Sequence, residues 1–160
     1  EYNSEGQVVG FTTTEYAYAL DGLYVGDMPQ TAYILGVTVK PVKGLQLQAI
    51  HKTYDKNYSD WSPGAREYDG TDADADRSQV WEAPGYSRLD LHMSYKLPKI
   101  NDLDMTLTGH IFNVLDEVYV QDAVDNSRYN SWGSKEHLAH NAEVFLGTPR
   151  YANIGLTINF

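Results

Sequence analysis

Apolar and polar residues alternate with a period of two along most of the chain. Segment 86–97 is the clearest case: the positions from Ser87 to Leu97 are mainly apolar, and those between them, from Tyr86 to Lys96, are mainly polar. Successive side chains of a strand point to opposite faces, so this segment predicts a strand with one apolar and one polar face. The same alternation predicts strands over five further segments: 7–20, 33–40, 44–57, 102–111 and 151–160.

The connections between these strands differ in length. Segments 40–44 and 98–101 carry Pro or Gly and predict tight turns, whereas 58–85 and 116–147 predict long polar loops. Short turns at one end and long loops at the other are typical of outer-membrane barrels. Soluble barrels and sandwiches share the alternation, but loops of about 30 residues are unusual in them. We therefore predict an all-β fold of antiparallel, up-and-down transmembrane β-barrel strands, with a soluble β-barrel that binds a small apolar ligand as the alternative.

Composition narrows the function classes. The formal charge of −10 and the pI near 4.7 argue against a nucleic-acid partner, because phosphate binding requires a basic surface. The absence of cysteine excludes disulfides and thiolate metal sites. No stretch reaches the roughly 18 apolar residues of a transmembrane helix, and the N-terminal residues lack the features of a signal peptide. We expect an internal or C-terminal piece of an exported protein.

Several motifs occur in a characteristic order. The segment from Pro84 onward resembles the C-terminal region of TonB-dependent receptors. Residues 112–119, Phe-Asn-Val-Leu-Asp-Glu-Val-Tyr, are similar to the family's N-L-F-D-x-x-Y block, and 147–150, Gly-Thr-Pro-Arg, are similar to its G-x-P-R block. The chain ends on aromatic Phe160, as family members do.

Other segments extend the resemblance over nearly the whole chain. Residues 40–45 and 58–61 resemble the preceding hairpin of the family. Residues 122–123 and 142–145 are most similar to receptors of Bacteroidetes-type bacteria.

The resemblance implies a fold, a location and a function. Residues 1–160 would be the C-terminal portion of a barrel of roughly 22 strands, with the plug domain and the other strands absent from this chain. The expected location is the bacterial outer membrane. Expected partners are outer-membrane lipid and lipopolysaccharide, the TonB complex through the missing plug, and the barrel-assembly machinery.

The expected function is import of a scarce nutrient into the periplasm with TonB-supplied energy. The substrate class that we favour is a ferric siderophore or other metal chelate; haem, an oligosaccharide or a peptide remain open. No nucleophile elbow, phosphate loop or dinucleotide fingerprint occurs in the sequence, so we expect no enzymatic activity and no cofactor. A small structural or adhesive outer-membrane barrel is a further alternative.

Two groups of strand residues have expected positions. Charged and polar residues of segment 86–97 should face the lumen, because Arg or Lys at the bilayer midplane costs about 2–4 kcal/mol; these are Arg88, Asp90, His92 and Lys96. Apolar residues of the last strand should serve barrel closure and recognition by the assembly machinery; these are Ile154, Leu156, Ile158 and Phe160.

Aromatic and histidine residues of the long loops are candidate ligand contacts, because aromatic faces stack on sugars and chelate rings. They are Trp61, Tyr68, Trp132, His137 and His140. For Tyr86 and Tyr119 we favour the interfacial aromatic belt, which also stays open as an alternative for Trp61 and Trp132. His137 and His140 form a His-x-x-His pair without a third ligand, which is typical of surface histidines, so no metal site is predicted.

An acidic run contains Asp69, Asp72, Asp74 and Asp76. The spacing of Asp72, Asp74 and Asp76 resembles the start of a calcium loop. Arg77 stands where such a loop needs Gly, and Ala83 where it needs Glu. The sequence therefore predicts a solvated loop tip.

Overall fold

The structure, a computed structural model, describes residues 4–7, 10, 15–71, 73, 75–99, 103–127 and 136–159. Its regular elements are antiparallel β-strands and short 3-10 helices. In chain order they are β1 (Ala17–Tyr18), β2 (Pro29–Val42), β3 (Leu45–Tyr58), η1 (Pro63–Arg66), β4 (Glu67–Tyr68), β5 (Glu82–Ala83), β6 (Tyr86–Lys96), β7 (Asp104–Phe112), β8 (Val120–Asp125), η2 (Ala139–Asn141), β9 (Ala142–Leu146) and β10 (Tyr151–Asn159). The prediction of an all-β, antiparallel fold is confirmed; among the described residues the strands do not close into a barrel.

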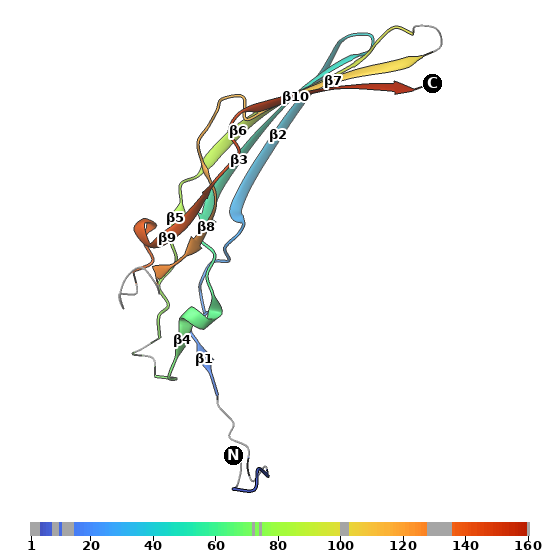
Figure 1. Ribbon diagram of the computed structural model, residues 1–160. Helices are drawn as coiled ribbons and strands as arrows, with labels where there is room; N and C mark the ends of the chain where they lie inside the picture. The colour runs from blue at the N-terminus through green and yellow to red at the C-terminus, as the bar shows by residue number, and fades with distance from the viewer. Residues whose placement is uncertain are drawn as a thin grey trace.

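The long strands form one curved sheet in the order β10-β7-β6-β3-β2, and β5 pairs with the end of β3 (Figure 1). Each long strand pairs with its neighbours along the chain, which is an up-and-down arrangement. Five of the predicted strands are therefore confirmed.

The prediction of a long strand over 7–20 is wrong for the residues described there. Only Ala17–Tyr18 form a strand, and they pair with β4 instead of with the large sheet. The amide of Ala19 donates to the carbonyl oxygen of Arg66 at 2.9 Å, and Ala19 is buried. The tertiary contacts of this segment thus hold it among the loops, although its side chains alternate.

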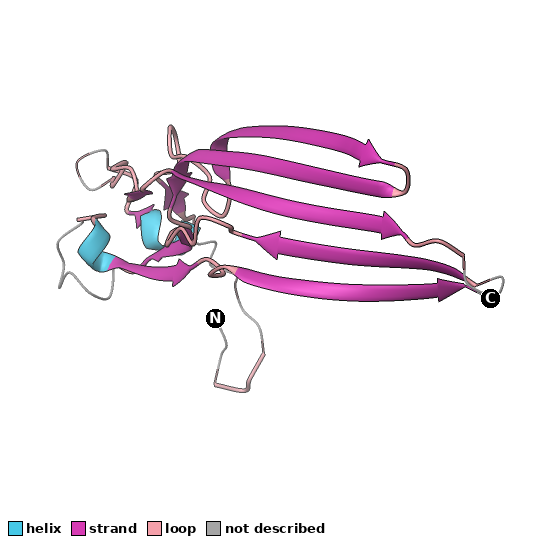
Figure 2. Cartoon of the chain, turned by 90° about the horizontal axis from the view of Figure 1, so that it is seen from above, coloured by secondary structure: helices cyan, strands magenta, loops and turns pink. Residues whose placement is uncertain are grey.

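The long connections gather at one end of the sheet, and the short turns and the C-terminus lie at the other (Figure 2). The first turn is shorter than predicted, because β2 continues to Val42 and only Lys43 and Gly44 turn. Gly44 has a φ of +85°, which favours glycine. Pro41 is accommodated within β2 because the β2–β3 register shifts between Val39 and Val42, where a missing N–H is tolerated.

The long connections are more structured than plain loops. The first contains η1, β4 and β5, and the second contains the β8–β9 hairpin and η2. Asp60 joins them: its amide donates to the carbonyl of Ala123 at 2.7 Å, and its carbonyl accepts from the amide of Asp125 at 2.8 Å. We call these two connections the loop cluster. These backbone hydrogen bonds join segments that are far apart in the sequence, so the periodicity of the sequence does not reveal them. They make the loop cluster a structural unit of its own.

The faces of the large sheet differ in polarity. The strand register aligns the apolar side chains of all five strands in cross-strand rows on one side, the apolar face. One such row is Val37, Ala49, Leu91, Ile111 and Ala152. The adjacent row, on the polar face, is Thr38, Gln48, His92, His110 and Asn153. Because the side-chain period of a strand is two, this register gives every strand the same polarity on each face.

The apolar face is exposed. Ile154 is 75% exposed and Leu35 is 68% exposed, and Leu91, Leu156 and Ile158 are exposed as well. The buried apolar residues are in or beside the loop cluster; they are Ala19, Val80, Ala83, Tyr119 and Ala123. Within the described part of the chain, no second layer covers either face of the large sheet. Such a sheet requires a partner for its apolar side.

Candidate functional site on the polar face and in the loop cluster

The predicted lumen residues of β6 share the polar face of the sheet. Asp90 is 2% exposed, and its Oδ2 lies 2.9 Å from the Nζ of Lys52 on β3. Its Oδ1 accepts a hydrogen bond from the backbone amide of Asn113 at 2.9 Å. Because a buried carboxylate is stable only when paired and hydrogen-bonded, these contacts fix β3, β6 and the end of β7 together. Lys96 lies at the opposite end of β6, 3.4 Å from Asp104.

Asn113 closes the turn that follows β7. It is 1% exposed and has a φ of +50°, a conformation that Asn tolerates better than most residues. Its Oδ1 accepts from the amide of Glu117 at 3.0 Å, and its Nδ2 donates to the carbonyls of Glu117 and Thr148 at 2.9 and 3.2 Å. The side chain therefore stabilises its own turn and ties it to the segment before β10.

The same two segments meet at further contacts. Asp116 Oδ1 accepts from the amide of Arg150 at 2.9 Å, and the Arg150 guanidinium donates to the carbonyl of Val114 at 3.4 Å. Gly147 packs directly against the ring of Tyr119, where a Cβ would overlap the ring, and its amide donates to the Tyr119 carbonyl at 2.9 Å. The two motif blocks identified in the sequence are thus the two halves of one packed junction.

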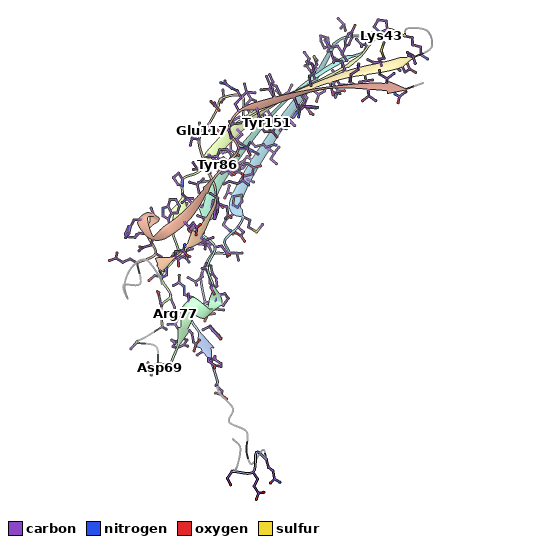
Figure 3. The ribbon with its side chains drawn as sticks, in the orientation of Figure 1. Lys43, Asp69, Arg77, Tyr86, Glu117 and Tyr151 are labelled. Atoms are coloured by element: carbon purple, nitrogen blue, oxygen red, sulfur yellow. The ribbon has the colours of Figure 1, made fainter. Side chains whose placement is uncertain are left out.

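An aromatic group lies where the polar face meets the loop cluster. The rings of Tyr86 and Tyr119 stack with centroids 4.2 Å apart, and Tyr54 lies 5.1 Å from Tyr86. Arg88 donates from Nη1 to the hydroxyl of Tyr119 at 2.7 Å. Tyr119 is 4% exposed, so its assignment to an interfacial belt is wrong. Its hydroxyl accepts the hydrogen bond from Arg88, which keeps the ring buried. Figure 3 shows Tyr86 and Glu117 midway between Lys43 at the sheet tip and Asp69 among the loops.

These tyrosines line a hollow of about 520 Å³, which we call the tyrosine hollow. Its wall is completed by polar residues and one proline: Asp27, Pro29, Arg88, Gln121 and Asp122. The negative charge of Asp60 raises the pKa of Asp27, with burial and Asp122 acting in the same direction. Aromatic faces beside an arginine and carboxylates can stack on a planar or sugar ring and hydrogen-bond its substituents.

A buried network of charged side chains holds the loop cluster together. His137 is 8% exposed; its Nδ1 lies 2.7 Å from Asp125 Oδ2 and its Nε2 lies 2.8 Å from Asp76 Oδ2. Arg66 is 1% exposed and lies 3.2 Å from Asp76 Oδ1. We call these residues, with Ser127, the loop network. It joins η1, the segment after β4 and the β8–β9 connection.

In this network, burial and ion pairing have opposite effects on the pKa values of the charged side chains. Burial lowers the pKa of Arg66, and the charges of Asp76 and Asp125 counteract that change. Burial would raise the pKa of Asp76, but hydrogen bonds from His137 and the Ser78 amide, together with the Arg66 charge, outweigh it and lower the pKa. Asp76 is therefore held as a carboxylate.

Ser127, His137 and Asp125 are residue types of a hydrolase triad, but their geometry differs from one. In a triad the serine and the aspartate face different ring nitrogens. Here Ser127 Oγ and Asp125 Oδ2 both lie against Nδ1, at 2.9 and 2.7 Å, and Asp76 occupies Nε2. The arrangement fits a structural network.

The predicted ligand contacts are dispersed. The indole of half-buried Trp61 donates to the carbonyl of Tyr24 at 2.9 Å. Tyr68 pairs with β1 in the loop cluster. His137 is enclosed in the loop network, whereas the side chain of His140 is 64% exposed and lies 3.9 Å from Glu136. Trp132 lies outside the described residues.

The acidic run is described only in part. Asp69 Oδ1 accepts from the amide and hydroxyl of Thr71 at 2.8 and 2.7 Å, and the hydroxyl contact is the main cause of a lowered pKa of Asp69. Asp76 belongs to the loop network, and Asp72 and Asp74 lie outside the described residues. Among the side chains that are described, no group of three or more His, Asp or Glu could hold a metal ion.

The last strand lies at the edge of the sheet. Ile154, Leu156 and Ile158 share the apolar face and pair with Gly109, Leu107 and Met105 of β7. In the part of the chain that is described, the other edge of β10 has no partner strand, and the outer edge of β2 has none either. Phe160 is outside the described residues.

Sequence reasoning missed Lys52, Tyr54, Arg66, Asp125 and His110 as parts of these sites. Their partners are distant in sequence and become neighbours only through the strand register or the packing of the loops. One signal was available: a hairpin centred on residues 98–104 places His92 opposite His110.

No family model, curated protein or solved structure matches the chain. Among the described residues, no helix is long and apolar enough to cross a membrane.

Proposed function

We propose that the chain forms five adjacent wall strands of an outer-membrane barrel that imports a scarce nutrient with energy supplied by TonB. The observation that carries the proposal is that the five long strands of the sheet share one continuous, exposed apolar face and one polar face. The motif resemblance of residues 112–119 and 147–150 supports the receptor family specifically.

Lipid is the partner that fits the apolar face. In water, apolar surface costs about 25 cal/mol per Å², so side chains such as Leu35 and Ile154 destabilise a sheet that nothing covers. In a bilayer the same side chains are stabilising. The long strands have between 9 and 14 residues, or roughly 30–46 Å at 3.3 Å per residue, which spans an apolar band of about 25 Å.

The polar face then lines the interior of the barrel. Lys52, Asp90 and Arg88 lie there as hydrogen-bonded groups, in keeping with the cost of placing charges in lipid. The unpaired edges of β2 and β10 require further strands, since each unsatisfied backbone group in lipid costs several kcal/mol. A barrel of roughly 22 strands with a plug inside meets that requirement.

The tyrosine hollow is the place where we expect the nutrient to contact this wall. Rings of Tyr54 and Tyr86 beside Arg88 suit a planar chelate with anionic groups. A ferric siderophore or other metal chelate is the proposed substrate class. An oligosaccharide, a peptide or haem is a distinguishable outcome of the uptake assay below.

One observation favours the soluble alternative. The apolar face is hollowed by a space of about 630 Å³ lined by residues such as Val37, Leu91 and Ile154, which could take a small apolar ligand. The two proposals differ in whether this hollow contacts lipid or a ligand.

The test is expression of the gene in a host bacterium that has an outer membrane, followed by membrane fractionation and uptake measurements with and without TonB. We expect the protein in the outer membrane, with a folded form that migrates faster than the boiled form in electrophoresis, and TonB-dependent uptake of a radiolabelled ferric chelate. A monomer that stays folded in buffer without detergent would refute the membrane assignment. Outer-membrane location with TonB-independent growth on every nutrient class would refute the transport role.

A further inference from the structure

Two histidines face each other on the polar face of the sheet. His92 on β6 and His110 on β7 are directly opposed in the register, and their Nδ1 atoms lie 2.8 Å apart. The ring centroids are 5.0 Å apart, so the two nitrogens point toward one another. Neither ring has a carboxylate partner among the described contacts, unlike His137.

The surroundings of the pair supply further donors and restrict the rings. Gln48 and Asn153 flank the pair in the same cross-strand row. The ring of Phe112 meets His92 edge-on, with centroids 5.4 Å apart, and stacks near His110 at 6.0 Å. All five residues line a hollow of about 550 Å³. A small ion with its water ligands fits in this space.

We propose that His92 and His110 bind a divalent transition-metal ion of the Cu(II) or Ni(II) type through their two Nδ1 atoms. For a metal–nitrogen distance of about 2.0–2.1 Å, nitrogens 2.8 Å apart subtend an angle of about 85° at the metal. That angle is the one between neighbouring ligands of a square-planar or tetragonal site, which Cu(II) and Ni(II) adopt. A tetrahedral Zn(II) site needs nitrogens about 3.3 Å apart.

Binding requires a small rearrangement of the rings. At present one Nδ1 donates its hydrogen to the other, so the donor ring must change to the tautomer protonated at Nε2. Concerted rotations about the soft Cβ–Cγ torsions, in which both Nδ1 atoms move toward the hollow and stay about 2.8 Å apart, then direct both lone pairs to a common point. Water and the amide oxygens of Gln48 and Asn153 can occupy the remaining positions, which gives the nitrogen and oxygen donor set that these ions favour.

This inference rests on the sheet register, the ring geometry of the pair and the hollow beside it, and it is independent of whether the barrel imports a nutrient. The chain offers matched controls. His51 lies on β3 of the same sheet but on the apolar face, and His140 is an exposed loop histidine. Substitution of either by Gln removes an imidazole without touching the pair.

The experiment is titration of the barrel that contains the chain, in detergent micelles, with Cu(II), followed by calorimetry and electron paramagnetic resonance. We expect one tight ion per chain, with hyperfine coupling to two nitrogens. His92→Gln and His110→Gln should each weaken binding by about 100-fold, because the second imidazole acts at a high effective concentration. His51→Gln and His140→Gln should bind as the parent chain does.

Retention of tight, two-nitrogen binding in His92→Gln or His110→Gln, or no tight binding by the parent chain, overturns the proposal. Circular dichroism checks that each variant keeps its sheet. If a variant unfolds, the parent chain still tests the proposal by nuclear magnetic resonance. The proposal requires that Cu(II) broaden the ring resonances of His92 and His110 before those of the other histidines. Broadening confined to His51, His137 or His140 contradicts the proposed site.

Discussion

Replacement of Leu156 by Arg distinguishes a lipid-facing sheet from a water-facing one. Leu156 is 55% exposed on the apolar face, opposite Leu107, and lies one residue past the centre of β10. If that face contacts lipid, the substituted side chain lies near the bilayer midplane. The matched control is Thr157→Arg, one residue along the same strand, whose side chain lies on the polar face opposite Thr106.

The expected magnitudes differ widely between the two positions. Arg near the midplane costs about 2–4 kcal/mol, so Leu156→Arg should lower the folding equilibrium constant by roughly 30- to 900-fold. Ile158→Arg, close to the end of the strand, should cost about 0–1 kcal/mol if that end reaches the interface. Thr157→Arg should change the free energy of unfolding by less than about 0.5 kcal/mol.

The assay is guanidinium unfolding, in phosphatidylcholine vesicles, of the barrel that contains the chain, followed by tryptophan fluorescence. The slope of the free energy against denaturant should stay the same among the variants, so that the midpoints report stability. Equal costs for Leu156→Arg and Thr157→Arg, or a neutral Leu156→Arg, would show that the apolar face does not contact lipid.

Three further predictions concern the junction, the loop network and the polar face. Gly147→Ala should destabilise the folded protein by about 1–3 kcal/mol, because the added Cβ overlaps the ring of Tyr119. Gly36→Ala should lower the free energy of unfolding by less, because the space around Gly36 is open. Equal unfolding midpoints for the two variants would contradict this prediction. The folded-state pKa of Asp76 lies below its ordinary value near 3.8, so the contribution of Asp76 to stability should be complete above that pH and lost as pH falls through the lower folded value. Limited proteolysis of the loop cluster between pH 5 and pH 2 should show this loss. The variant Asp76→Asn should lack this pH dependence. Asp90→Ala should cost about 3–5 kcal/mol by leaving Lys52 unpaired, and adding Lys52→Met should recover part of it in the same denaturant assay.

Strand faces could be predicted from the sequence because they depend on local alternation. In segment 86–97 the apolar and polar positions separate without reference to any other segment, and the structure confirms that division. Segment 7–20 shows the limit of this reasoning. Its alternation is weaker but compatible with a strand, and Ala17–Tyr18 pair with β4, because pairing depends on which partner edge is available in space.

The motif blocks illustrate a second limit. Residues 112–119 and 147–150 stand out in the sequence, but only packing explains them: Asn113 bonds to Thr148, and Gly147 makes room for Tyr119. Likewise His137 looked like a partner of His140, whereas the folded loops enclose it between Asp76 and Asp125. Contacts between residues so far apart cannot be deduced from local propensity.

The sequence by itself determined the period of two, the five long strands of the large sheet and the side of each that is apolar, because these depend only on neighbouring residues. The tertiary structure decided which strands are adjacent and in which register. A shift of one residue would exchange the faces of a strand, so register alone places Lys52 beside Asp90 and His92 against His110. Only the pairing of the chain in space could set that alignment.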